Sequence, residues 1–192
     1  MNKILLIGGG GHCKSCIDVI EQQGLYEIAG IIDQPRAVGS RVLGYEVIGS
    51  DEDLPSLRNT FDYAFVTVGQ IRSADLKIKL YQSLKSLNFI VPTIISPLAY
   101  VSQHAQISSG TIVMHQALVN AGAKVGENCI INTKALIEHD AVIEDHCHVS
   151  TGAIINGGGE IFSESFVGSL ATSKQCVQIG KKSFIKAGSV MK

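Results

Sequence analysis

The C-terminal half of the chain carries an aliphatic residue at every sixth position, and between Ile95 and Ile185 only Ser173 breaks this register. A small residue stands four positions after each aliphatic one, as Ala99 follows Ile95. Such hexapeptide repeats are typical of a parallel β-helix, in which each segment is one short strand with its aliphatic side chain inside and the small residue at a corner. One segment has no stability alone, so about five coils of roughly 18 residues must stack. The break at Ser173 predicts a loop that bulges from one corner over residues 173–178.

The first part of the chain alternates short apolar runs with segments of helical spacing. These patterns predict strands at residues 3–7, 27–32, 63–68 and 89–94, and helices at residues 12–23 and 73–87. A strand, a glycine turn, a helix and a second strand form a βαβ unit, which implies a small parallel sheet. We therefore expect an α/β, Rossmann-like half fold over residues 1–93 and an all-β parallel β-helix over residues 94–192.

The balance of charges excludes several classes of partner. Sixteen Lys and Arg against seventeen Asp and Glu give a net charge of -1, without the basic excess of a nucleic-acid-binding protein. The apolar run at Ile4–Ile7 is too short for a signal peptide or a membrane span. Five cysteines, an odd number, favour reduced thiols. We expect a cytoplasmic protein that binds neither nucleic acid nor a membrane.

The histidines and cysteines favour neither a metal site nor redox chemistry. Six histidines are present, but no pair has the spacing of a zinc finger, so we expect no metal. Cys13 and Cys16 form a CxxC at the start of a predicted helix, where the pKa of a thiol falls. The surrounding pattern is not that of thioredoxin, and the glycine turn already explains the position.

The glycine turn Gly8–Gly11 precedes the first predicted helix. Gly-rich turns at helix starts bind phosphates through backbone N–H groups and the helix dipole. The dinucleotide fingerprint is incomplete, because Cys13 stands where a third glycine would be. One half of a dinucleotide-binding fold suits a ligand that carries a single nucleotide. The alternative is a tight turn that binds no ligand. Gly11 is expected to need a positive φ or close ligand approach, and Asp33, at the end of the second strand, fits a ribose or base contact.

His139 is the strongest candidate for a general base, because histidine has an unperturbed pKa near neutrality. It lies two residues after the inward-facing Ile137. Gly157 stands one coil further, so it should stack over His139 at about 4.8 Å and could offer its N–H to a developing oxyanion. His148 is half a coil away and could face a neighbouring subunit. The alternative for each histidine is a surface or packing role.

The whole pattern resembles bacterial sugar acyltransferases of the sialic acid O-acetyltransferase and nucleotide-sugar N-acetyltransferase family. The resemblance rests on the hexapeptide array, the turn from Gly8 to His12, the strand ends Ile32-Asp33 and Val68-Gly69, and Ile137-Glu138-His139-Asp140 followed by His148. It implies a left-handed β-helix and a homotrimer with acetyl-CoA, the co-substrate, lying between subunits. The implied activity is acetyl-CoA-dependent N-acetylation of a nucleotide-linked 4-amino-4,6-dideoxy sugar, expected to be a UDP-sugar.

The resemblance also implies roles for single residues. It makes His139 the catalytic base and Asp140 the carboxylate that raises its basicity. Acetyl-CoA contacts are implied at His148, Gly157, Ser169 and Ala187. Nucleotide-sugar contacts are implied at Gly10, Gly11, His12, Asp33, Gln34 and Gly69.

Three other functions stay open on the sequence. O-acetylation of a sugar hydroxyl, as in sialic acid, would not need the nucleotide-binding turn. An oxidoreductase would need the missing second half of the dinucleotide fold. A non-catalytic β-helix scaffold would leave the Glu138-His139-Asp140 segment without a role.

Overall fold

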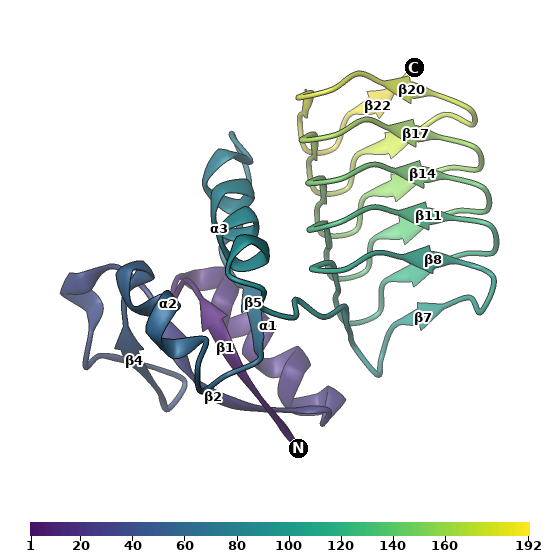
Figure 1. Cartoon of the computed structure of the whole chain (residues 1–192). Helices are drawn as coiled ribbons and strands as arrows, with labels where there is room; N and C mark the ends of the chain where they lie inside the picture. The colour runs from purple at the N-terminus through teal and green to yellow at the C-terminus, as the bar shows by residue number, and fades with distance from the viewer. The chain divides into compact units, whose positions relative to one another are not determined.

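The computed structural model describes residues 1–192, which form two compact units (Figure 1). The first unit comprises residues 1–69 and 75–92, and the second comprises residues 70–74 and 93–192. Residues 70–74 group with the coil because Gln70 hydrogen-bonds to it: its Nε2 donates to the carbonyl oxygen of His146 at 2.9 Å, and its own carbonyl oxygen accepts from Nδ1 of His148. No helix is long and apolar enough to cross a membrane.

The first unit is built on a five-stranded mixed sheet in the order β3-β4-β2-β1-β5, in which only β3 is antiparallel to its neighbour. Its strands are β1 (Asn2–Ile7), β2 (Tyr26–Ile32), β3 (Arg41–Val42), β4 (Tyr45–Gly49) and β5 (Tyr63–Val66). Its helices are α1 (Gly11–Gln23), α2 (Leu54–Leu57), α3 (Asp75–Ser86) and the 3-10 helices η1 (Pro35–Ala37) and η2 (Asp51–Asp53). Strand β1 lies between β2 and β5 in the sheet, and its last four residues, from Ile4 to Ile7, are fully buried.

Two features of this sheet differ from the sequence expectation. Strands β3 and β4 were not predicted, because β3 has only two residues and β4 alternates buried and exposed side chains over five. The strand predicted at residues 89–94 does not form: Ile90 makes a single bridge to Tyr63, and Ile94 begins the coil. Pro92 explains the interruption, since proline has no N–H to continue a ladder.

The second unit is a left-handed parallel β-helix of two-residue strands in three sheets. The β7–β22 sheet contains β7 (Tyr100–Val101), β10 (Leu118–Val119), β13 (Leu136–Ile137), β16 (Ile154–Ile155), β19 (Thr172–Ser173) and β22 (Val190–Met191). The β8–β20 sheet contains β8 (Gln106–Ile107), β11 (Lys124–Val125), β14 (Val142–Ile143), β17 (Glu160–Ile161) and β20 (Gln178–Ile179). The β6–β21 sheet contains β6 (Ile94–Ile95), β9 (Ile112–Val113), β12 (Ile130–Ile131), β15 (His148–Val149), β18 (Phe166–Val167) and β21 (Phe184–Ile185).

The predicted repeat of one coil is confirmed by the pairing of these strands. Val119 pairs with Ile137, and Ile137 pairs with Ile155, so each strand lies over the strand one coil earlier. All three side chains point inward and are fully buried. The coil interior is therefore a continuous apolar column, and each strand depends on its neighbours above and below.

The corners of the coil are made by residues with a left-handed backbone. Every sixth residue from Gly110 to Gly188 has a positive φ. Nine of these residues are not glycine: Gln116, Asn128, Lys134, Asp140, His146, Glu164, Leu170, Cys176 and Lys182. The following small residue, such as Ala141, is buried in the interior. The left-handed conformation costs a non-glycine residue roughly 1–2 kcal/mol, so the ladder must hold it at each corner.

The predicted loop at residues 173–178 is wrong, because the coil continues through this segment without a break. Ser173 occupies the inward position of β19, which pairs with β16 and β22, and it is 2 % exposed. Its Oγ accepts a hydrogen bond from the N–H of Asn156 at 2.8 Å. This bond satisfies the buried hydroxyl group, so a serine can replace the aliphatic residue.

Candidate active site

His139 and Asp140 form a hydrogen-bonded pair at a corner of the coil, directly after β13. Nδ1 of His139 lies 2.9 Å from Oδ2 of Asp140, and both side chains are more than half exposed. Because a carboxylate only accepts, Nδ1 carries the proton and Nε2 keeps its lone pair. The hydrogen bond with Asp140 raises the pKa of His139 above its usual value, and the charges of Asp140 and Glu138 act in the same direction.

Gly157 lies directly over the imidazole of His139, in the stacking that the repeat predicts. A Cβ atom at Gly157 would be 2.7 Å from Nε2 of His139, closer than real Cβ contacts allow. The imidazole can therefore take this position only because residue 157 is glycine. The N–H of Gly157 donates to no group of the chain. A base and a backbone N–H without a partner thus lie side by side at one corner of the coil.

Glu138 supports this corner from the other side. Its Oε2 accepts hydrogen bonds from Nδ2 of Asn120 at 2.8 Å and from the N–H of His139 at 3.2 Å. The carboxylate is thus used to hold the backbone that carries the histidine. These contacts favour a positioning role for Glu138 over the role of a second base.

His148 lies elsewhere on the coil and is buried, with 7 % of its surface exposed. Its Nδ1 donates to the carbonyl oxygen of Gln70 at 2.5 Å, and its Nε2 lies 3.0 Å from Nδ2 of Asn132. Oδ1 of Asn132 accepts from the N–H of Thr133, so its amide must direct the NH₂ group at the ring. The imidazole is therefore neutral, with its proton on Nδ1. Its expected contact with acetyl-CoA stays a prediction.

Ser169 and Ala187 stack one coil apart, at the corner that precedes β19 and β22. His139 and Gly157 lie at the corner that follows β13 and β16. The first corner lies where the strands of the β7–β22 sheet begin, and the second lies where they end. One chain therefore does not bring the two predicted groups of acetyl-CoA contacts together.

The glycine turn of the first unit is held by Asp33. The two carboxylate oxygens of Asp33 accept the N–H of Gly9 at 2.9 Å and the N–H of Gln34 at 2.7 Å. Gly10 is the N-cap of α1 and has no side chain to cap the helix, so the first turn leaves N–H groups for a ligand. His12 lies in this turn, beside Gly69, the last residue of the unit's first segment. The structure thus gathers the predicted nucleotide contacts around the carboxyl ends of β1, β2 and β5.

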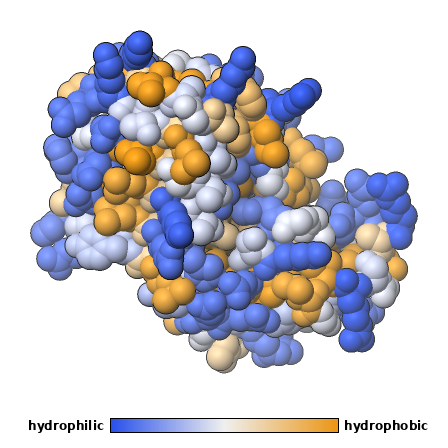
Figure 2. Space-filling view, turned by 180° about the vertical axis from the view of Figure 1, so that it is seen from behind, coloured by the Kyte–Doolittle hydropathy of each residue, from blue (hydrophilic) through white to orange (hydrophobic).

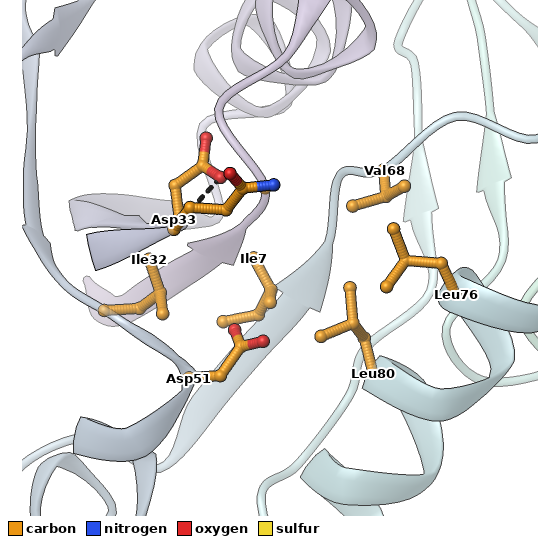
Figure 3. A pocket seen from close by; sticks show the side chains of 9 residues that line it. Ile7, Ile32, Asp33, Asp51, Val68, Leu76 and Leu80 are labelled. Carbon is orange, nitrogen blue, oxygen red and sulfur yellow. Dashed lines mark hydrogen bonds between the residues drawn. The ribbon is translucent and has the colours of Figure 1, made fainter. Parts of the chain in front are cut away.

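A cleft of about 140 Å³ opens beside this turn (Figure 3). Asp33 lies on one side of the cleft, and Leu76 and Leu80 of α3 lie on the other; Gln34 also lines it. Asp51 of η2 also lines it. Burial raises the pKa of Asp51 above its usual value; the charge of Asp33 adds to this rise, while Lys79 opposes it.

Asp51, Leu76 and Leu80 line the cleft but were not among the predicted site residues. Asp51 follows β4, a strand that the hydrophobic pattern did not reveal, so nothing placed it at the edge of the sheet. Leu76 and Leu80 lie four residues apart on α3, and their spacing could have indicated one face of that helix. Which face meets the cleft follows only from the packing.

The CxxC segment has no features of a redox site. Cys13 and Cys16 are both buried in the first unit and are not bonded to each other. Burial raises the pKa of both thiols, which disfavours the reactive thiolate. Both cysteines pack α1 against the sheet as small apolar side chains.

We predict that Gly8 and Gly11 respond differently to alanine. Gly8 has a φ of +104°, and a Cβ there would meet Val68, so Gly8→Ala should lower the free energy of unfolding by about 1–3 kcal/mol. The expectation of a positive φ at Gly11 is wrong, and a Cβ at Gly11 meets nothing within 4 Å. Gly11→Ala should therefore keep its stability and raise the KM of a phosphate-bearing acceptor that approaches the turn.

Thermal unfolding measures the stability of both variants, and acceptor kinetics measure the KM. An equal loss of stability in Gly8→Ala and Gly11→Ala would contradict the different roles assigned to the two glycines.

Comparison with known proteins agrees with the two-part architecture. Residues 3–84 match the model of the PglD N-terminal domain. The chain is 32% identical over 110 residues to an uncharacterized protein of Acanthamoeba polyphaga mimivirus, a match that spans 57% of this chain and 21% of that protein.

Two solved structures are similar along the full chain. A variant of perosamine N-acetyltransferase from Caulobacter crescentus, in complex with CoA and GDP-perosamine, is 31% identical with a TM-score of 0.93, covering 100% of this chain and 89% of that one. The acetyltransferase domain of PglB from Neisseria gonorrhoeae, in complex with acetyl coenzyme A, is 31% identical with a TM-score of 0.90, covering 100% of this chain and 93% of that one.

Proposed function

Because the chain belongs to the bacterial sugar N-acetyltransferases of the hexapeptide-repeat family, we propose that it transfers an acetyl group from acetyl-CoA to the amino group of a nucleotide-linked amino sugar. The sugar is proposed to be a 4-amino-4,6-dideoxy sugar, as the resemblance implies. The observation that carries the proposal is the exposed imidazole of His139, which is hydrogen-bonded to Asp140 and lies against the backbone of Gly157.

His139 is proposed to act as the general base. Its side chain is 58 % exposed, so an amine can approach Nε2, which lies beside Gly157. As the amine attacks, Nε2 takes its proton and the ring becomes an imidazolium. Asp140, 2.9 Å from Nδ1, stabilises this cation and holds the tautomer. The proton then leaves with the departing thiolate, which returns His139 to its neutral state.

Gly157 supplies what the thioester needs at this point. Acetyl-CoA, when bound, provides an activated acetyl carbon that the amine attacks while the bond to sulfur breaks. The N–H of Gly157, which has no acceptor within the chain, is suited to the oxygen of that acetyl group. The missing side chain lets the imidazole of His139 lie against the backbone of residue 157.

The first unit is proposed to hold the nucleotide part of the acceptor. The start of α1, with the N-cap Gly10 and the N–H groups of Gly11 and His12, suits the diphosphate. Asp33 and Gln34 line the adjacent cleft. These positions favour a nucleotide sugar over a free sugar such as sialic acid, which would leave the turn without a ligand.

We propose a homotrimer in which the β7–β22 sheets of three subunits face each other. Side chains alternate along a strand, so in each two-residue strand of the coil the first side chain points outward and the second points into the interior. The outward row of this sheet is largely apolar, whereas that of the β8–β20 sheet is largely polar. The apolar row consists of Tyr100, Leu118, Leu136, Ile154 and Val190, with Thr172 between the last two. Figure 2 shows exposed apolar residues over the coil.

This assembly would complete the site. Two corners border the β7–β22 sheet at opposite ends of its strands. One carries His139 and Gly157, and the other carries Ser169 and Ala187. Threefold packing of that sheet places the first corner of one subunit beside the second corner of the next. Acetyl-CoA between two subunits would then reach both groups of residues.

An acidic substitution in the apolar row tests this assembly. Ile154→Asp is expected to give a monomer without acetyltransferase activity, because a charge in an apolar interface is costly. Val142→Asp, the same kind of change on the β8–β20 sheet, is the matched control and should stay trimeric and active. Light scattering and CoA release measure both properties. A monomeric wild-type protein at micromolar concentration would refute the trimer.

The proposed activity is tested by following the release of CoA thiol from acetyl-CoA. The acceptors are UDP-, dTDP- and GDP-linked 4-amino sugars and free sialic acid. Release with a nucleotide amino sugar, together with an N-acetylated product, is the expected result. Release of CoA with sialic acid alone would contradict the proposal and indicate O-acetyltransfer. No release of CoA with any acceptor would indicate a non-catalytic scaffold.

A further inference from the structure

We propose that the cleft of the first unit binds a guanine base, whose N1–H and 2-amino group donate hydrogen bonds to the carboxylate of Asp51. The inference rests on the proposed function, because it names the base of the nucleotide sugar. It selects guanine over the uracil of the UDP-sugar that the sequence resemblance implies.

The order of the strands indicates where the diphosphate, the ribose and the base of a nucleotide would lie. In the sheet, β4 lies beside β2 and β2 beside β1. The glycine turn follows β1, Asp33 follows β2, and Asp51 follows β4. A diphosphate at the start of α1 and a ribose near Asp33, the position that ribose takes in dinucleotide folds, leave the base to extend toward Asp51.

Asp51 is the open acceptor of this cleft. Both oxygens of Asp33 already accept backbone N–H groups, from Gly9 and Gln34. No group of the chain donates a hydrogen bond to the carboxylate of Asp51, which lines the same cleft (Figure 3). Hydrogen-bond donors on a ligand would therefore meet an ionised carboxylate with both oxygens available.

The opposite wall of the cleft suits a flat ring. Val68, Leu76 and Leu80 present aliphatic side chains there (Figure 3). A planar base can lie against these side chains with its edge toward Asp51, whereas a ribose would place hydroxyl groups against them. The cleft thus combines an apolar wall with an acceptor at its edge, a usual arrangement for small-molecule sites.

The chemistry of the bases decides which ring fits. An ionised carboxylate only accepts hydrogen bonds. Guanine presents two adjacent donors, N1–H and the 2-amino group, which match the two oxygens of one carboxylate. Uracil presents a single N–H between two carbonyl oxygens, and these oxygens would face the carboxylate without a bond. A site built to accept donors discriminates against a ligand that lacks them.

Binding of free nucleotides to the full-length protein tests the inference by calorimetry. GDP is expected to bind about 10–100-fold more tightly than UDP, the range for hydrogen bonds to a charged group. IDP, which keeps N1–H and lacks the 2-amino group, should lie between them. Equal binding of GDP and UDP would overturn the base assignment alone. Failure of every nucleotide to bind would overturn the nucleotide-sugar function as well.

Two variants separate the base from the ribose. Asp51→Asn should weaken GDP about tenfold and leave UDP nearly unchanged. Glu52→Gln removes the same charge from an exposed neighbour outside the cleft and should keep the preference for GDP. If Asp51→Asn weakens GDP and UDP alike, and has no effect on 2′-deoxy-GDP, Asp51 contacts the ribose and the inference is refuted. Unchanged thermal unfolding of both variants shows that the fold is intact.

Discussion

Replacing His139 with alanine is expected to lower kcat by roughly 10²–10⁴, the contribution of a general base. The imidazole is largely exposed, and the interior beneath it is filled by Ile137 and Ala141, so the variant should unfold at the wild-type temperature. His104→Ala replaces another exposed histidine of the β-helix. It is the matched control and should keep full activity. If His139→Ala stays active while His148→Ala is inactive, the base is misassigned.

The pH dependence gives a second test of the same residue. The base must be neutral, so kcat/KM should rise with pH through the pKa of His139, which Asp140 holds above its usual value. Asp140→Asn keeps a residue that tolerates the left-handed corner, where φ is +59°, but removes the charge. The rising limb should therefore move to lower pH, with a smaller loss of kcat than in His139→Ala. A limb that persists unchanged in His139→Ala would belong to the acceptor amine.

Replacing Gly157 with alanine is the second substitution with a large expected effect. The new Cβ would lie 2.7 Å from Nε2 and 2.8 Å from Cε1 of His139, so the imidazole must move from the position that faces the acceptor. Displacement of a reacting group by about 1 Å can cost 10²-fold in rate, so a loss of that order in kcat is expected.

The control for this variant is Gly180→Ala, because a Cβ at Gly180 meets no atom within 4 Å and φ there is not positive. Gly180→Ala should keep its kcat and its unfolding temperature. Wild-type kcat in Gly157→Ala would show that the position of the imidazole against Gly157 does not matter for the reaction. An equal loss of kcat in both variants would indicate a general effect of altering the coil.

The coil could be predicted because its contacts repeat at one fixed separation along the chain. Each strand pairs with the strand one coil earlier, so the aliphatic register alone placed Gly157 over His139. The same register failed at Ser173, where a polar side chain is tolerated because Asn156 donates a hydrogen bond to it. A hydrophobic pattern cannot report a hydrogen bond that satisfies a buried serine.

The hexapeptide coil, the glycine turn at the start of α1 and the pairing of His139 with Asp140 follow from the sequence alone, since each depends on neighbours in the chain or on a constant repeat. Two other contacts become visible only in the folded chain: Gln70, 78 residues away, binds the ring of His148, and Asp51 shares a cleft with Asp33. These contacts join segments with no periodic relation. They arise when separate elements pack, so no local pattern of side chains specifies them.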